Sequence, residues 1–204
     1  MESKRFLEII NGSNSSFLTN YSQFKYIKAL LKKHKKKYIH IWSFPCASGE
    51  EPFSLAMYFD QLKKSIGNSP KFKIYTSRFN HNTFEKARKG IYKEKTILEI
   101  PQIYKKTYFK EIPMASANGA EYSISRDIIN SVEFFEEDII KDHSKLPKFD
   151  IIVCRNFLFS VKEIFKNRLL EIFKDHLIDM GLLIIGISEM IMNKDNIFKL
   201  VDLR

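Results

Sequence analysis

Five short apolar segments rich in Ile, Val and Phe alternate along this chain with longer stretches of helical spacing. Each segment is bounded by polar or turn residues and has the length of a buried β-strand. Strands that alternate with helices favour a parallel sheet with right-handed crossover connections. The predicted strands are IHIWSF (39–44), KFKIYTS (71–77), SVEFF (131–135), KFDIIVC (148–154) and MGLLIIGI (180–187), and the predicted helices include residues 21–37, 50–65, 80–90 and 161–177.

The residues that follow the predicted strands are the most informative for function. In an open parallel sheet, ligands bind in a crevice at the carboxyl ends of the strands. A ligand site is therefore predicted where the five strand exits meet. In chain order these exits read PCASGEEP, SRFN, EEDII, RNFLFS and SEM.

Two adjacent acids, Glu50 and Glu51, stand where the first predicted strand ends and a helix begins. The amino terminus of a helix carries a partial positive charge, which by itself favours acidic residues. The alternative is that one carboxylate binds a cationic ligand. Gly49 leaves a similar choice open, because a glycine there either lets the backbone approach a ligand or only makes the turn.

Composition limits the classes of protein and partner. A chain of 204 residues suggests one domain, and a net charge of +10 favours an acidic partner. A Lys-rich composition can also produce this charge without any such partner. The run KKHKKK (32–37) lacks interleaved aromatic residues, so we expect no nucleic-acid partner.

Cysteine usage and hydropathy predict the compartment. Cys46 and Cys154 provide neither a disulfide framework nor a metal-ligand spacing, which indicates a reducing compartment and no metal. The first residues, MESKRFLEII, do not resemble a signal peptide, and no apolar run is long enough to cross a bilayer. We therefore expect a cytoplasmic protein that does not insert into a membrane.

Four stretches occur in the order, and at nearly the spacing, of the motifs of one known family. They are WSFPCASGEEPFSLA (42–56), FEKARKGIY (84–92), KFDIIVCRNFLF (148–159) and GISE (186–189). Together they resemble the chemotaxis-receptor protein-glutamate O-methyltransferases of the CheR type. The resemblance implies an α/β, class I S-adenosylmethionine-dependent methyltransferase fold, a Rossmann-like sheet with helices on both faces and a small β-hairpin subdomain.

The resemblance also implies a division of the chain and a reaction. Residues 1–37 would be a remnant of the family's N-terminal helical domain with the loop that closes over the cofactor. Residues 38–204 would be the methyltransferase domain, with the β subdomain inserted at about 104–127. The cofactor would be S-adenosyl-L-methionine and its product S-adenosyl-L-homocysteine. The acceptors would be glutamate side chains in the cytoplasmic domain of methyl-accepting chemotaxis proteins.

Site residues follow from the family motifs position by position. The second acid of GEEP contacts the methionine portion in the family, and this acid is Glu51 here. Two matched pairs of neighbouring residues, Asp138 with Ile139 and Asn156 with Phe157, each combine a polar and an apolar side chain. A core-packing role therefore stays open for Ile139 and Phe157. No general base is expected, because a glutamate carboxylate is already ionised near neutral pH. The implied cofactor contacts are Ser13, Ser15, Thr19, Glu51, Arg78, Asp138, Ile139, Asn156 and Phe157.

Four of the matched positions depart from the family pattern. Arg78 replaces the acid that binds the ribose hydroxyls, and the lost bonds would cost about 2–4 kcal/mol. Thr19 replaces an arginine, Ser160 a tyrosine and Ile187 a histidine. Three hypotheses follow. The chain is an active protein-glutamate methyltransferase with an altered cofactor site, a catalytically degenerate binding module with weak or no affinity for the cofactor, or a methyltransferase with another acceptor.

Overall fold

The structure of the chain is a computed structural model that describes residues 16–19, 21–24, 27, 36–65, 70–79, 81–113, 119–191 and 198–199. Helices and strands alternate through most of this range. The elements are η1 (Tyr21–Gln23), β1 (Tyr38–Ser43), α3 (Glu50–Ser65), β2 (Lys71–Ser77), α4 (His81–Lys89), β3 (Ile91–Lys93), α5 (Glu94–Ile97), α6 (Gln102–Tyr108), β4 (Phe109–Ile112), β5 (Glu121–Ile124), α7 (Arg126–Asn130), β6 (Val132–Phe135), β7 (Phe149–Cys154), η2 (Leu158–Ser160), α8 (Glu163–His176) and β8 (Leu177–Ile185).

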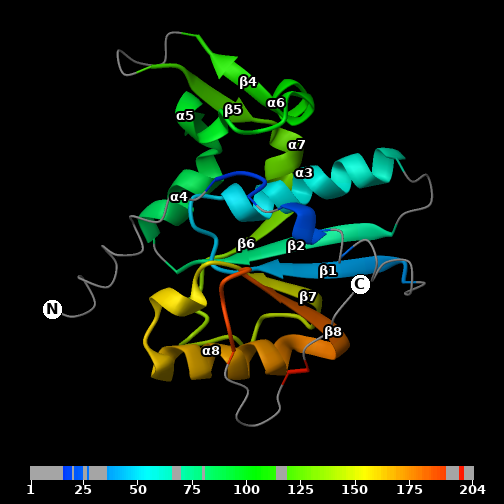
Figure 1. The fold of residues 1–204 in the computed structure, drawn as a ribbon, viewed down its shortest axis with the longest axis vertical. Coiled ribbons are helices and arrows are strands. Elements are labelled where there is room, and N and C mark those ends of the chain that lie inside the picture. The colour runs from blue at the N-terminus through cyan, green and yellow to red at the C-terminus, as the bar shows by residue number, and fades with distance from the viewer. Residues whose placement is uncertain are drawn as a thin grey trace, which may run out of the picture.

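A five-stranded parallel sheet forms the centre of the molecule. Its strand order is β6-β2-β1-β7-β8, and all four neighbouring pairs are parallel. The chain order reverses between β1 and β7, which makes this the switch point where such sheets bind ligands. Figure 1 shows α3 on one face of the sheet and α8 on the other. This arrangement confirms the predicted class I, Rossmann-like fold.

Successive side chains of β1 point to opposite faces of the sheet and pack into two apolar layers. Ile41 is fully buried in the layer beneath α3, together with Phe53 of that helix. Trp42, the next residue, is fully buried in the layer beneath α8, where its ring stacks on Phe149 and meets Phe173 edge-on. Burying a side chain of this size contributes about 1.5–3 kcal/mol, so both helices are held to the sheet mainly by apolar contact.

A second, smaller sheet lies beyond α3, at the top of Figure 1. It has the order β3-β5-β4 and is antiparallel, so the predicted β-hairpin is present as β4 and β5. The strand β3 was not predicted, because three residues are too few for a periodic pattern. The boundary of this subdomain at about 104–127 stays a prediction.

Several element limits agree with the predicted ones, but the last strand differs, and most of the predicted helix 21–37 lies outside the described residues. The predicted spans of α3 and β2 match the observed ones, whereas β8 begins at Leu177 rather than at residue 180. The chain passes from α8 into β8 without a loop, and a register shift against β7 follows. Met180 adopts a positive φ of 62° within this irregular part. A bulge adds residues to a strand without continuing its regular alternation of apolar side chains. The apolar pattern therefore did not include the first residues of β8.

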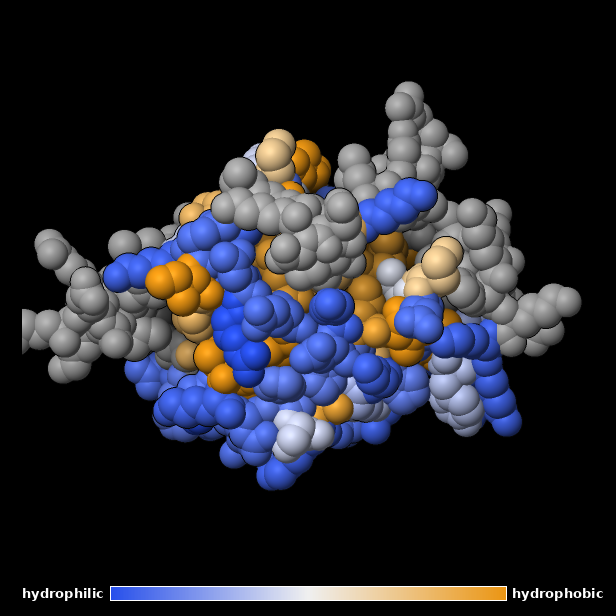
Figure 2. Space-filling model, turned by 90° about the horizontal axis from the view of Figure 1, so that it is seen from below, coloured by the Kyte–Doolittle hydropathy of each residue, from blue (hydrophilic) through white to orange (hydrophobic). Residues whose placement is uncertain are grey.

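The outer surface is largely polar. Figure 2 shows hydrophilic side chains over much of the face seen from below, where α8 lies in Figure 1.

Among the described residues, no helix combines the length and apolar character needed to span a bilayer.

A histidine pair at the carboxyl end of α8 gives a prediction about pH. His143 Nδ1 and His176 Nε2 are 2.9 Å apart, and His176 Nδ1 lies 3.0 Å from the carbonyl of Pro147. If His176 is neutral and donates to Pro147, its Nε2 accepts from His143. Burial lowers the pKa of His176 below its ordinary 6.5, and nearby His143 and Lys148 act in the same direction.

The unfolded chain therefore binds this proton more readily than the folded chain. We expect the unfolding free energy to fall as the pH drops below about 6.5, by at most about 1.4 kcal/mol per pH unit for this group. Thermal unfolding of wild type and His176→Gln measures the effect. The two pH values compared are 7.5 and 5.5, each about one unit from the ordinary histidine pKa. His176→Gln should lose this dependence, whereas His81→Gln, at an exposed position, should keep it. Equal dependence in all three proteins would contradict the prediction.

Candidate functional site

The carboxyl ends of β1 and β7 lie side by side at the switch point of the sheet. Residues 41–43 of β1 pair in register with residues 151–153 of β7. The chain leaves β1 through a turn into α3, and it leaves β7 through residues 155–160 into α8. Polar side chains from these two exits therefore meet.

Glu51 and Arg155 form an ion pair at this edge of the sheet. Arg155 Nε lies 3.1 and 3.2 Å from the two carboxylate oxygens of Glu51, and Nη2 lies 2.7 Å from Oε2. The Arg155 side chain is 4% exposed and that of Glu51 21% exposed. A carboxylate offers about four acceptor positions, so Glu51 retains capacity for a further donor on its exposed side.

The N-terminal segment reaches the same guanidinium. Arg155 Nη1 donates to the carbonyl of Thr19 at 2.8 Å and to Gln23 Oε1 at 3.0 Å. The guanidinium carbon lies 5.3 Å from the centre of the Phe24 ring. The hydroxyl of Thr19 donates instead to the carbonyl of Ser16. Thr19 therefore faces Arg155 with its main chain, and Arg155 ties the N-terminal segment to the exit of β7.

The turn before α3 is fixed by packing against the protein itself. Gly49 has a φ of +96°, and a Cβ at this position would lie 2.6 Å from the Phe53 ring and 2.8 Å from the Tyr92 hydroxyl. That hydroxyl donates to the carbonyl of Ser48 at 2.7 Å. The space on this side of Gly49 is thus filled by side chains, so the glycine is needed to make and pack the turn.

Arg78 follows β2 directly, as predicted. Its main-chain N–H donates to the carbonyl of Phe135, and its Nη1 lies 3.4 Å from His81 Nδ1. The guanidinium thus lies beside the start of α4. The exit of β2 therefore carries a cationic side chain.

Asp138 and Ile139 follow β6 and differ in what they present. The Asp138 carboxylate is 45% exposed, lies 3.7 Å from the Lys141 ammonium and accepts the main-chain N–H of Ile140. Ile139 is buried in the layer beneath α8. Only the first of the two offers a polar side chain at the surface.

Asn156 and Phe157 follow Arg155, and again the polar side chain is exposed whereas the apolar one is buried. Asn156 is exposed and adopts a positive φ of 58°. Phe157 is buried, with its ring edge-on to Phe44 and Phe79. The Ser160 hydroxyl donates to the carbonyl of Phe157 at 2.7 Å, which holds it to its own turn.

The structure brings together some of the predicted contact residues. Thr19 and Glu51 meet around Arg155, and Asn156 is adjacent to it, whereas Arg78 and Asp138 lie at the neighbouring exits of β2 and β6. Ser13 and Ser15 lie outside the described residues. Sequence reasoning missed Arg155, Gln23 and Glu189 as site residues. A charged residue directly after the wholly buried β7 was the available signal for Arg155.

The two cysteines near these exits are poor nucleophiles. Cys46, in the turn after β1, is fully buried, and burial raises the pKa of its thiol to about 12. Burial also raises the pKa of Cys154, the last residue of β7. Both are therefore thiols rather than thiolates near neutral pH. The described residues contain no group of three or more His, Cys, Asp or Glu side chains that could hold a metal ion.

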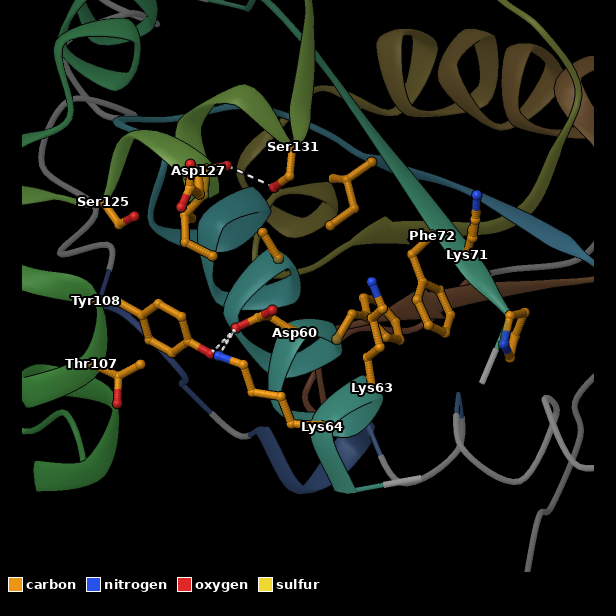
Figure 3. A pocket seen from close by; sticks show the side chains of 15 residues that line it. Asp60, Lys63, Lys64, Lys71, Phe72, Thr107, Tyr108, Ser125, Asp127 and Ser131 are labelled. Atoms are coloured by element: carbon orange, nitrogen blue, oxygen red, sulfur yellow. Dashed lines mark hydrogen bonds and ion pairs between the residues drawn. The ribbon is translucent and has the colours of Figure 1, made fainter. Parts of the chain in front are cut away.

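A hollow of about 480 Å³ lies elsewhere, between α3, α6, α7 and the start of β2. Figure 3 shows Asp60, Lys64 and Tyr108 pointing toward one another within it. The Tyr108 hydroxyl and the Lys64 ammonium each donate to Asp60 Oδ2 at 2.6 Å. Lys71, on its lining, begins β2, which puts the hollow at the amino end of the strands. It is therefore separate from the strand-exit site.

Comparison with known proteins places nearly the whole chain in one family. The family model described as CheR methyltransferase, SAM binding domain, matches residues 13–204. The chemotaxis protein methyltransferase of Borreliella burgdorferi is 29% identical over 184 residues, which cover 89% of this chain and 62% of that protein. The match therefore spans less than two thirds of that relative's length.

Two further relatives carry the same description. The chemotaxis protein methyltransferase of Listeria monocytogenes is 29% identical over 192 residues, which cover 92% of this chain and 69% of that protein. The corresponding protein of Campylobacter jejuni is 30% identical over 192 residues, which cover 91% of this chain and 67% of that protein.

Proposed function

This chain belongs to the CheR methyltransferase family, and on that premise we propose that it transfers a methyl group from S-adenosylmethionine to glutamate side chains of chemoreceptors. The observation that carries the proposal is the Glu51–Arg155 pair at the switch point of the sheet. The amino-acid end of the cofactor carries an ammonium and a carboxylate. The Glu51 carboxylate, held 2.7 Å from the guanidinium of Arg155 and 21% exposed, offers an acceptor for that ammonium.

The other residues at the strand exits fit the cofactor unevenly. Glu51 would accept from the ammonium on its exposed side, and Arg155, whose side chain is 4% exposed, would hold the Glu51 carboxylate in place. Asp138 and Asn156 offer exposed polar groups for the nucleoside, and Ser13, Ser15 and Thr19 belong to the segment proposed to close over it. The ribose lacks the expected acceptor, because Arg78 follows β2.

The bound cofactor supplies an electrophilic methyl group on a positively charged sulfur. The chain's own residues have to bind, orient and exclude water, since an ionised glutamate already carries the attacking lone pair. Arg155 holds Thr19 and Gln23 at the exit of β7, where they would shield the reacting groups from solvent.

A protein acceptor is supported by the surface beside the site. Phe159, Ile187 and Met190 are exposed apolar residues on the loops that follow β7 and β8. Exposed apolar side chains gathered at one place are typical of protein-binding surfaces. The chain's net charge of +10 would attract an acidic partner. We propose that an acidic helical segment of the cytoplasmic domain of a methyl-accepting chemotaxis protein docks here.

The degenerate-module alternative would require a site unable to hold the cofactor. Two observations count against it. Glu51 is partly buried beside a cation rather than lying in bulk solvent, and the Arg78 guanidinium lies beside His81 at the start of α4.

Titration calorimetry with S-adenosylmethionine and S-adenosylhomocysteine tests the proposal. We expect dissociation constants below about 1 mM for both ligands. Arg78→Asp should strengthen binding about tenfold, because a carboxylate at this exit can accept from the ribose hydroxyls. Arg126→Asp makes the same charge change just before β6, at the amino end of the strands, and should leave binding unchanged. Binding weaker than millimolar in wild type and Arg78→Asp would overturn the proposal.

A further inference from the structure

The carboxylate of Glu189 gathers main-chain N–H groups from two strand exits. Oε2 accepts from the amides of Gly186 at 2.7 Å and Asn156 at 2.8 Å. Oε1 accepts from Leu158 at 2.6 Å and, more weakly, from Phe159 at 3.4 Å. Glu189 follows β8 in a turn and is 9% exposed. One side chain thus connects the loop after β7 with the turn after β8.

These amides need a partner that the local chain does not supply. Residues 156–159 leave a strand and enter the short 3-10 helix η2, whose first amides have no acceptor within the helix. Converging N–H groups of this kind form a concave, electropositive nest that suits an anion. Among the described residues, Glu189 takes part in no ion pair, so its charge is balanced by main-chain dipoles alone.

The two loops pack closely at this contact. A Cβ on Gly186 would meet the Asn156 side-chain oxygen, and it would lie 2.8 Å from Glu189 Oε2. Asn156 itself adopts a positive φ, which is uncommon for a residue other than glycine. The backbone of the loop after β7 is therefore held in one particular conformation by a carboxylate that lies 33 residues further along the chain.

We propose that Glu189 is a positioning residue for the cofactor site. It fixes the loop that carries Asn156 and follows Arg155, and the site loses its geometry when the carboxylate is replaced by a group that cannot accept four N–H bonds. This inference rests on the proposed function for its consequence in binding, but not for its consequence in the loop. Glu189 itself is not proposed to touch the cofactor.

Asp150, in the strand β7 that precedes the loop held by Glu189, offers a control. It is also a buried carboxylate, 6% exposed, and it accepts a main-chain N–H, that of His40, at 2.8 Å. It begins β7, however, at the edge of the sheet opposite the strand exits. Asp150→Asn should therefore perturb stability without moving the site.

The experiment compares wild type, Glu189→Gln and Asp150→Asn at a temperature where all three are folded. Calorimetry with S-adenosylhomocysteine should show binding weakened about tenfold to a hundredfold in Glu189→Gln and essentially unchanged in Asp150→Asn. Amide hydrogen exchange without ligand should show faster exchange at residues 156, 158 and 186 in Glu189→Gln alone.

Unchanged exchange at these amides in Glu189→Gln would overturn the positioning role. Faster exchange with unchanged affinity would overturn its relevance to the cofactor. If wild type does not bind S-adenosylhomocysteine, the proposed function fails and the cofactor-binding part of this inference fails with it. The exchange data then still decide whether Glu189 holds the loop.

Discussion

Replacing Glu51 with Gln is expected to lower the unfolding free energy by about 2–4 kcal/mol and to abolish measurable cofactor binding. The guanidinium of Arg155 is 4% exposed, and Glu51 supplies its counter-charge. Removing one partner of a buried pair leaves the other charge desolvated and uncompensated, which costs more than the pair itself contributes. Because Glu51 is partly exposed, we expect a loss of unfolding free energy near the lower end of the range seen for buried ion pairs. Urea unfolding and calorimetry measure the two effects.

An exposed ion pair on α8 is the control for this substitution. Arg168 and Glu171 lie 3.3 Å apart with side chains that are 46% and 59% exposed. Glu171→Gln should change stability by less than about 0.5 kcal/mol, because water screens such a pair. A double-mutant cycle over Glu51→Gln and Arg155→Met should give a coupling energy of at least about 1 kcal/mol. Additive effects in the cycle would show that the two side chains do not depend on each other.

Gly49→Ala is expected to destabilise the fold by about 3–5 kcal/mol, through strain and overlap together. The residue has a φ of +96°, which is unfavourable for any residue with a Cβ. That Cβ would lie 2.6 Å from the Phe53 ring, 2.8 Å from the Tyr92 hydroxyl and 3.0 Å from the Cβ of Ala87. Because three different elements surround the position, no single movement relieves the overlap. Thermal and urea unfolding measure the loss.

Gly119 separates the backbone contribution from the steric one. It has a similar φ of +105°, but within the described part of the chain no atom lies within 4 Å of its Cβ position. Gly119→Ala should therefore cost only the backbone strain, about 1–2 kcal/mol. If both substitutions cost the same, the packing around Gly49 contributes nothing and the turn has room for a side chain.

The fold was predictable because its information is local and periodic. The strand KFKIYTS and the helix that begins at Glu50 were placed at their observed limits. The alternation of strands and helices implied a parallel sheet, and right-handed crossovers leave few possible topologies. The short β3 and the irregular start of β8 were missed, because they depend on pairing with distant strands.

The candidate site was only partly predictable. The acids after β1 could be located from the motif, and Glu51 was chosen over Glu50 by resemblance. The partner of Glu51 could not be predicted from local patterns, because Arg155 lies 104 residues further along the chain. Ile139 and Phe157, for which a core-packing role was left open, are buried side chains in the structure.

The amino-acid sequence by itself determined which segments become strands and helices, and that their polar exits lie along one edge of a sheet. Periodicity and turn chemistry suffice for this, since they act over a few neighbouring residues. Only the tertiary structure decided that Arg155 pairs with Glu51 and that Glu189 gathers the amides after β7. Such contacts depend on the paths of loops between distant elements and on side-chain directions that no local pattern specifies.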